Sequence, residues 1–376
     1  MSSITTPGAA APGTRLHSAE FRRFAPGSVN KTITVRPYRP EDRVRWDAYV
    51  QREPQGKFYH HSGWNHVIEK TFGHEIYRWI AEDGDGHING VLPLVHMKSL
   101  LFGSFMVSLP YLNYGGVCAQ DDATHRALVQ AAVAVAERKN VEYIELRYDR
   151  SLHSGLPVKE SKVSMRLELP ANPSDLWKAL GSKLRSQIAR PQKEGMYGRI
   201  GREEELDSFY RVFSINMKDL GTPVYPKAFF KNILDEFPQS TWICSIYDKH
   251  HAPVASGFLT GFKRTLEIPW ASSLKKFNRF SPNMLLYWTT LKFACDNGYE
   301  TFDFGRSTRG SGTYKFKAQW GAQPVPLYWH YWLRSGVALP ELNLANPKYQ
   351  LAIRLWRKLP LAVATILGPL IVKNIP

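Results

Sequence analysis

The chain has 376 residues, which is too long for a single domain with one ordinary hydrophobic core and suits two domains of roughly 150 residues with tails. Its 49 Lys and Arg against 33 Asp and Glu give a net charge of +16 with neutral His, which favours anionic partners such as phosphates, tRNA or a lipid surface. With 43% hydrophobic residues and 11 Trp, 18 Tyr and 19 Phe, the composition excludes a disordered or fibrous chain for most of the length.

The two ends differ from the body in composition. Residues 1–30 are rich in Ala, Pro, Gly, Ser and Thr without a continuous apolar segment, so we expect a disordered leader and no secretory signal. Residues 359–372 are apolar but interrupted by proline and glycine, and they are too short to span a hydrocarbon core of about 30 Å. Cations without an intervening acid flank this stretch: Lys348, Arg354, Arg357, Lys358 and Lys373.

This C-terminal tail, residues 339–376, has two interpretations that stay open. Residues 348–373 have the composition of a segment lying in an anionic membrane interface. Alternatively, the tail packs on the protein's own surface.

Three distant cysteines argue against a disulfide scaffold and a clustered zinc site: Cys118, Cys244 and Cys295. We therefore predict a cytoplasmic protein, either free or peripheral on the inner face of the plasma membrane.

The first part of the body reads as alternating strands and helices, an α/β pattern. A strand is expected from residue 33 to 38, an antiparallel pair over 76–81 and 87–97, and a further strand over 105–109. A helix follows over 123–139 and a strand over 143–146. These elements define a predicted first domain, residues 31–165.

The second part repeats the same order and defines a predicted second domain, residues 166–338. A helix starts near Ser174, another covers 206–219, and strands follow over 241–247, 253–262 and 265–271. Ser281 as cap and Pro282 at the first position predict a helix over 283–296, followed by a strand over 301–304. Residues 140–146 match 296–304 as helix end plus strand, with Glu145 over Asp303 at an offset of 158 residues.

The order of elements in each copy resembles the GNAT acyltransferase fold, and two copies resemble the FemA/FemB/FemX family. Residues 303–321, DFGRSTRGSGTYKFKAQWG, resemble the FemAB-related proteins of exosortase and exopolysaccharide loci. The resemblance covers about residues 55–335. It implies an acyl or aminoacyl transferase with tandem GNAT-like domains, each a mixed sheet with flanking helices, that makes amide bonds on a cell-envelope component.

Acyl transfer to an amine needs a base, a positioned donor carbonyl and positive groups where the oxyanion develops. We expect Asp303 to act as general base or ammonium anchor; a carboxylate paired with a nearby Arg is the alternative. If residues 314–317 are extended, Tyr314 and Phe316 face one way and the lysines the other. By the resemblance, Lys317 lies near the transferring carbonyl, where it would stabilise negative charge. The remaining residues expected to line the cleft are Tyr111, Tyr114, Trp270, Arg306, Ser307 and Tyr314.

The donor is left open among aminoacyl-tRNA, acyl-coenzyme A and acyl carrier protein. The loop 273–281 lacks the glycines with which many GNAT enzymes bind a pyrophosphate, although its basic and aromatic residues could contact an anionic donor. The predicted donor-phosphate residues are Lys275, Lys276, Arg279 and Asn283. No metal is expected, because the histidines near residue 60 lack supporting ligands.

The leading hypothesis is therefore an N-acyltransferase that acts on an amino group of an envelope or exopolysaccharide-related acceptor. One alternative is an acyl-coenzyme A or acyl carrier protein dependent enzyme that acylates an amino lipid or sugar. Another is a non-catalytic, membrane-associated scaffold of exopolysaccharide assembly.

Overall fold

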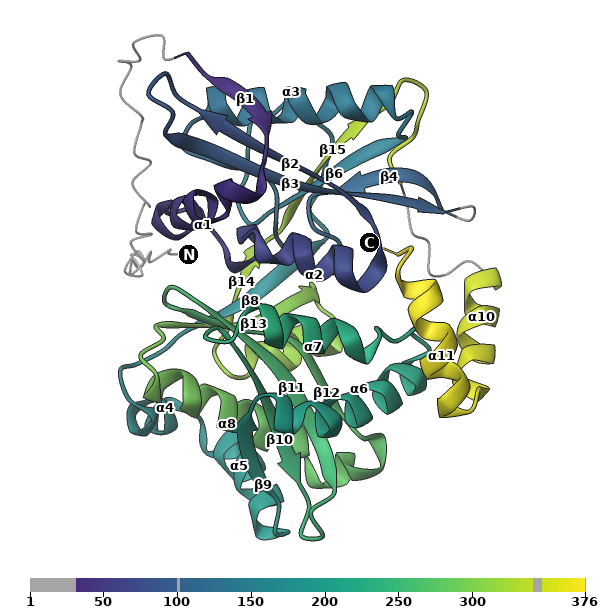
Figure 1. Cartoon of the computed structure of the whole chain (residues 1–376). Coiled ribbons are helices and arrows are strands. Elements are labelled where there is room, and N and C mark those ends of the chain that lie inside the picture. The colour runs from purple at the N-terminus through teal and green to yellow at the C-terminus, as the bar shows by residue number, and fades with distance from the viewer. Residues whose placement is uncertain (1–31, 100–101, 341–346, 376) are drawn as a thin grey trace, which may run out of the picture. The chain divides into compact units, whose positions relative to one another are not determined.

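The computed structural model describes residues 32–99, 102–340 and 347–375, and the chain from Ile33 onward forms one compact unit (Figure 1). The predicted leader, residues 1–30, lies outside the described residues. The described residues form two mixed sheets with flanking helices, which confirms the predicted α/β fold class. We call the first sheet with its helices the first half, and the second sheet with its helices the second half.

The first sheet has the strand order β1-β2-β3-β4-β6-β15-β7, with β5 beside β3. Its strands are β1 (Thr34–Pro37), β2 (Glu75–Glu82), β3 (Ile88–Ser99), β4 (Gly103–Val107), β5 (Cys118–Ala119), β6 (Tyr143–Tyr148), β7 (Val158–Lys159) and β15 (Tyr328–Leu333). Its helices are η1 (Pro40–Asp42), α1 (Arg43–Arg52), η2 (Phe58–His60), α2 (Gly63–Phe72) and α3 (Asp122–Arg138).

The second sheet has the order β14-β8-β13-β12-β11-β10-β9. Its strands are β8 (Lys162–Glu168), β9 (Tyr197–Gly201), β10 (Thr241–Tyr247), β11 (Pro253–Phe262), β12 (Thr265–Ser273), β13 (Thr301–Thr308) and β14 (Gln323–Pro326). Its helices are α4 (Pro173–Ala179), α5 (Ser182–Lys193), η3 (Glu203–Glu205), α6 (Leu206–Leu220), α7 (Lys227–Glu236), η4 (Lys275–Phe280), α8 (Pro282–Asp296) and α9 (Gly312–Ala318).

The halves exchange chain segments. The predicted boundary between residues 165 and 166 falls inside β8, which pairs with β13 in the second sheet. Near the end of the body, β15 returns to the first sheet, where Tyr331 pairs with Glu145. The chain therefore passes from the first sheet to the second between β7 and β8, and returns between β14 and β15. The predicted domain boundaries stay predictions.

Each sheet contains a parallel pair of neighbouring strands: β4 with β6 in the first, and β12 with β13 in the second. The last paired residues are Val107 with Glu145 and Glu267 with Asp303. Beyond Glu267 and Asp303 the pairing stops although β12 and β13 both continue, so the two strands separate. The predicted match of Glu145 with Asp303 is confirmed, because both residues end a parallel pairing.

Two local predictions were wrong. Residues 314–317 are not extended but lie in α9, because the Ser311 side chain accepts a hydrogen bond from the Tyr314 backbone N–H and caps the helix. Ser281 does precede α8, but its φ of 58° places it in the left-handed region and its side chain makes no capping hydrogen bond.

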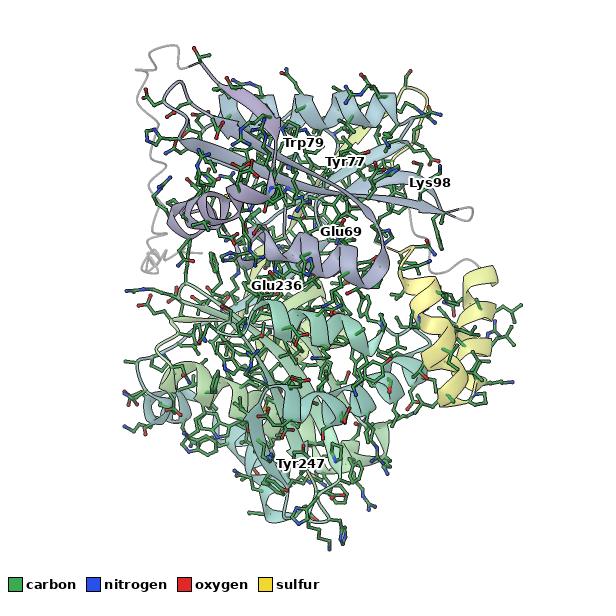
Figure 2. All side chains as sticks on the ribbon, in the orientation of Figure 1. Glu69, Tyr77, Trp79, Lys98, Glu236 and Tyr247 are labelled. Carbon is green, nitrogen blue, oxygen red and sulfur yellow. The ribbon has the colours of Figure 1, made fainter. Side chains whose placement is uncertain are left out.

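The two halves share a hydrophobic core in which α2 faces α7 (Figure 1). Phe58 and Trp64 of the first half pack with Phe237 of the second at ring-centroid distances of 4.7 and 5.3 Å. Glu236, labelled in Figure 2, accepts a hydrogen bond from Arg43 across the same boundary. These contacts hold side chains from both halves in a common site.

The tail forms α10 (Pro347–Lys358) and α11 (Leu361–Val372), which contact α6 at the edge of the second half (yellow in Figure 1). None of the helices in the described part of the chain has both the length and the apolar character needed to cross a bilayer.

Candidate active site

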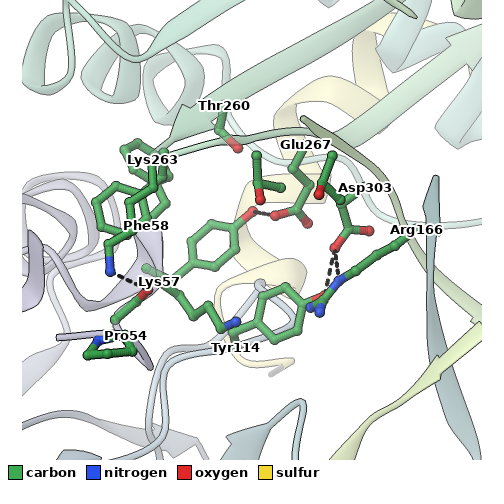
Figure 3. A pocket seen from close by; sticks show the side chains of 14 residues that line it. Pro54, Lys57, Phe58, Tyr114, Arg166, Thr260, Lys263, Glu267 and Asp303 are labelled. Carbon is green, nitrogen blue, oxygen red and sulfur yellow. Dashed lines mark hydrogen bonds and ion pairs between the residues drawn. The ribbon is translucent and has the colours of Figure 1, made fainter. Parts of the chain in front are cut away.

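A cavity of about 240 Å³ lies where the first half meets the separating strands β12 and β13 (Figure 3). Its polar lining comes from both halves. The side chains that matter for its chemistry are Lys57, Tyr59, Tyr114, Arg166, Lys263, Glu267 and Asp303. Parallel pairing places Glu267 and Asp303 side by side on the same face of the sheet, and both carboxylates point into this region.

Asp303 is not an isolated carboxylate at the sheet surface. Its side chain is buried and accepts hydrogen bonds from the Tyr114 hydroxyl at 2.8 Å, the Gly305 backbone N–H at 2.8 Å and the Ser164 hydroxyl. Arg166 Nε donates to the same carboxylate at 3.2 Å. The alternative of a carboxylate paired with Arg therefore describes the observed contacts. Four donors therefore fix the position of the Asp303 carboxylate.

Glu267 is a candidate functional residue that the sequence analysis missed. Its side chain is buried and accepts hydrogen bonds from the Tyr59 hydroxyl at 2.8 Å and the Asn113 amide at 3.4 Å. Burial, together with the negative charge of Asp303, raises the pKa of Glu267 to about 8. The available signal was an acid between Leu266 and Ile268 in a predicted strand, because such a position faces away from the apolar layer.

A network of charged side chains extends from this cavity toward a second, adjoining cavity. Arg166 donates to Asp149 at 2.7 Å, and Lys57 contacts the same carboxylate at 2.9 Å. Although burial opposes it, these two cations hold the pKa of Asp149 at about 2. Lys57 and Tyr114 also line a second cavity, of about 270 Å³, so the two spaces adjoin.

Lys317 is buried in α9, and the described residues that line the first cavity do not include it. Its Nζ donates to the backbone oxygens of Gly305 at 2.9 Å and Arg306 at 3.0 Å. Burial lowers the pKa of Lys317 to about 8, against the opposing effect of Asp303 and Glu267. Gly305 connects Asp303 to Lys317, because its N–H donates to the Asp303 carboxylate and its backbone oxygen accepts from Lys317. Its φ of 73° lies in the left-handed region, which favours glycine.

The structure brings Tyr114 to Asp303 but places the other predicted cleft residues elsewhere. Tyr111 donates to the backbone oxygen of Lys373, and Trp270 packs against aromatic side chains of α7 in the core. The remaining three also lie away from the cavity lining: Arg306 is over the Trp329 ring, Ser307 is buried in β13 and Tyr314 packs beside the second core. Their assigned roles in substrate binding stay predictions.

The predicted donor-phosphate residues gather at the start of α8. Lys275, Lys276 and Arg279 are exposed in η4, and Asn283 lies half-buried in the first turn of the helix. Lys276 and Arg279 stand over the rings of their neighbours Phe277 and Phe280, at 4.9 and 4.5 Å from the ring centroids. Phosphate binding by this group, like the expectation of no metal, stays a prediction.

The equivalent place in the first half has different chemistry. Val107 stands opposite Glu145, where the second half has Glu267 opposite Asp303. Glu145 accepts hydrogen bonds from Arg147 Nε at 2.6 Å and the Tyr331 hydroxyl at 2.7 Å. At these two positions the carboxylate pair therefore belongs to the second half.

Residues 181–318 match the family described as "Acetyltransferase (GNAT) domain". The search of curated proteins found no similar sequence. Solved structures with a similar fold include FemX, with a TM-score of 0.60 and 16% identity over 83% of this chain and 98% of that chain.

Two further structures support the tandem arrangement. L-PGS from Bacillus licheniformis has a TM-score of 0.52 and 13% identity, covering 85% of this chain and 98% of that chain. A tandem GNAT protein from the clavulanic acid biosynthesis pathway has a TM-score of 0.51 and 9% identity, covering 82% of this chain and all of that chain. Residues 181–318 are therefore similar to a GNAT acetyltransferase domain, and the chain as a whole has a fold like that of tandem GNAT proteins.

Proposed function

We propose that this protein transfers an acyl or aminoacyl group to an amino group, with the chemistry at Glu267 and Asp303. The observation that carries the proposal is the pair of buried carboxylates in a cavity at the point where β12 and β13 separate. A buried carboxylate with a pKa of about 8 is suited to take a proton from an amine near neutral pH.

The two carboxylates take different roles in this proposal. Four donors, Arg166 among them, hold the Asp303 carboxylate in a fixed position, and in this proposal it forms the fixed side of the place where the ammonium ion enters. Glu267 accepts fewer hydrogen bonds and is the better proton acceptor. This assigns the base role to Glu267, beside the originally expected Asp303.

The reaction proceeds without a covalent enzyme intermediate. Glu267 removes one proton from the ammonium nitrogen, and the resulting amine attacks the donor carbonyl carbon. A carbon–nitrogen bond forms, the bond from that carbon to the leaving oxygen or sulfur breaks, and the second nitrogen proton passes to the leaving group. Lys317 lies outside the cavity lining, and in this proposal its positive charge beside β13 acts on the developing oxyanion through space.

The acceptor we propose is a cell-envelope or exopolysaccharide-related amine, in line with the resemblance of residues 303–321 to FemAB-related proteins. Lys57 lines both adjoining cavities and Arg166 lines the first, and both contact Asp149, so this charged border suits an acceptor that carries polar groups near its amine. The two cavities together are large enough for an acceptor bigger than a simple amine.

A second candidate within the same class uses acyl-coenzyme A or an acyl carrier protein to acylate an amino lipid or sugar. The match of residues 181–318 to a family described as acetyltransferase favours it. The basic residues of η4 at the start of α8 fit the phosphates of these carriers as well as those of a tRNA. The donor therefore has to be found by experiment.

The test is a screen of purified protein with three donor classes, aminoacyl-tRNA, acyl-coenzyme A and acyl carrier protein, against amino sugars and amino lipids. Mass spectrometry would detect the amide product. We expect one donor class to give product, and Glu267→Gln to lose it. The matched control is Glu300→Gln, which changes an exposed carboxylate one residue before β13. Product that persists in Glu267→Gln would refute the assignment, whereas no product from any donor would favour the scaffold alternative.

A further inference from the structure

Helices α10 and α11 present an apolar surface that the rest of the described protein does not cover. In α11 the side chains turned inward are small or β-branched, namely Ala364, Gly368 and Val372, which are buried. A Cβ atom at Gly368 would lie 2.8 Å from the backbone nitrogen of Val224, so the helix lies against the second half at close range. The inner face therefore has no room for large side chains.

The large apolar side chains of these helices face outward instead. Ile366 and Leu370 are 69% and 58% exposed, and α11 contains no charged residue. The exposed apolar residues of the two helices are Leu351, Leu355, Leu361, Val363, Ile366, Leu367, Leu370 and Ile371. A helix that packs small residues inward and exposes large ones is the reverse of an ordinary surface helix. We call these eight side chains the tail surface.

The tail itself carries charge of a single sign. Residues 342–376 contain five Lys and Arg and no Asp or Glu. Arg354 and Lys358 are exposed on α10, on either side of Leu355 in the sequence. An apolar face whose own charged residues are all cations complements a lipid surface with anionic head groups.

The tail surface is also fastened to both halves. Arg357 donates to the backbone oxygen of Leu220 in α6 at 3.2 Å. At the other end of α11, the backbone oxygen of Lys373 accepts from the Tyr111 hydroxyl at 2.9 Å, with His74 Nε2 at 2.8 Å. The helices are thus attached to the body rather than trailing from it, so a membrane bound to them would hold the cavity at a fixed orientation.

We propose that the tail surface inserts into the interface of an anionic membrane leaflet. The acyl-transfer proposal does not depend on this inference, and the binding test below needs no substrate. The two interpretations of the tail, packing on the protein and binding to a membrane, are then compatible, because its small residues pack on the protein and its large residues enter the lipid.

The test is co-sedimentation of the full chain with vesicles of phosphatidylcholine alone or with phosphatidylglycerol. We expect binding to the anionic vesicles, with weaker binding to neutral ones and at high salt. Ile366→Glu should lower the partition coefficient about ten-fold or more, since it removes a large apolar side chain from the interface. The matched control is Val44→Glu, at a 79% exposed position on α1, which should leave binding unchanged.

A second pair of variants tests the charges. Arg354→Gln with Lys358→Gln should weaken binding about twenty-five-fold, since each cation near an anionic surface contributes about five-fold. Lys183→Gln with Arg190→Gln removes the same two residue types from α5 and should have no effect. Thermal unfolding of every variant separates lost binding from lost folding.

Two results would overturn the inference. One is wild-type protein that does not sediment with phosphatidylglycerol vesicles, or Ile366→Glu that sediments as wild type does. The other is a wild-type dimer in light scattering that Ile366→Glu dissociates, because the tail surface would then be an interface between two copies of the chain.

Discussion

Replacing Glu267 by Gln tests the base through the pH dependence of the reaction. Its pKa of about 8 means that about a tenth of the molecules carry the reactive carboxylate at pH 7, so kcat/KM should rise with pH up to about 8. Lys317, with a pKa also of about 8, must stay protonated to stabilise the oxyanion, so the rate should fall above that pH. The wild-type profile is therefore a bell centred near pH 8.

In Glu267→Gln the rising limb that belongs to the enzyme should vanish, and kcat/KM at pH 8 should fall by about 10²- to 10⁴-fold, the usual contribution of a general base. The amine acceptor has its own pKa, which an NMR titration of the free acceptor supplies for correction. The fold should survive, because the Tyr59 hydroxyl can donate to the amide oxygen as it does to the carboxylate.

The stability of this variant supplies an internal check. A raised pKa means that the stability associated with Glu267 is complete below its ordinary pKa of 4.5 and lost as pH rises through about 8. Glu267→Gln should therefore be at least as stable as wild type at pH 8.5, which urea unfolding measures. A variant that folds, keeps the rising limb and reacts within ten-fold of wild type would refute the reasoning.

Three further changes test the parts around this base. Asp303→Asn removes the neighbouring negative charge, so the pKa of Glu267 should drop below 8, as a carbon-13 NMR titration of the carboxyl groups would measure. An unchanged pKa would show that Asp303 does not influence the titration of Glu267. Lys317→Gln should lower kcat about 10²- to 10³-fold and abolish the falling limb above pH 8, and a retained limb would assign it to another group. Gly368→Leu forces a side chain against the Val224 backbone and should cost about 1–3 kcal/mol of unfolding free energy in urea, whereas Ala362→Leu, at an exposed position, should cost little.

Local patterns in the sequence were sufficient for most elements of the fold. The helices over 123–139 and 206–219 and the four strands predicted over 241–247, 253–262, 265–271 and 301–304 follow from apolar spacing and turn residues, and the structure has them within a few residues of the expected bounds. The strands β8, β9 and β14 of the second half were not predicted. The match of Glu145 with Asp303 also held, because it rests on a repeated sequence order. The return of β15 to the first sheet could not be predicted, since it depends on pairing between residues 186 positions apart.

The site was only partly predictable for the same reason. Asp303 stands in a distinctive motif, whereas Glu267 becomes meaningful only through the register of β12 against β13, which no local pattern specifies. The four donors around Asp303 include Tyr114 and Arg166, which come from distant segments. Trp270 was expected at the cleft because aromatic residues suit both clefts and cores, and only packing decides between them.

The most direct test of the central claim compares the two halves in one assay. Glu267→Gln and Glu145→Gln make the same chemical change beside the same kind of parallel pairing, but only the first removes a carboxylate from the pair. Glu145→Gln should destabilise the protein, because Arg147 loses its buried partner, while its rate of amide formation per folded molecule should stay within about three-fold of wild type. Glu267→Gln should lose at least about 100-fold in that rate. Equal losses in the two variants, or a loss only in Glu145→Gln, would contradict the assignment of the chemistry to the second half.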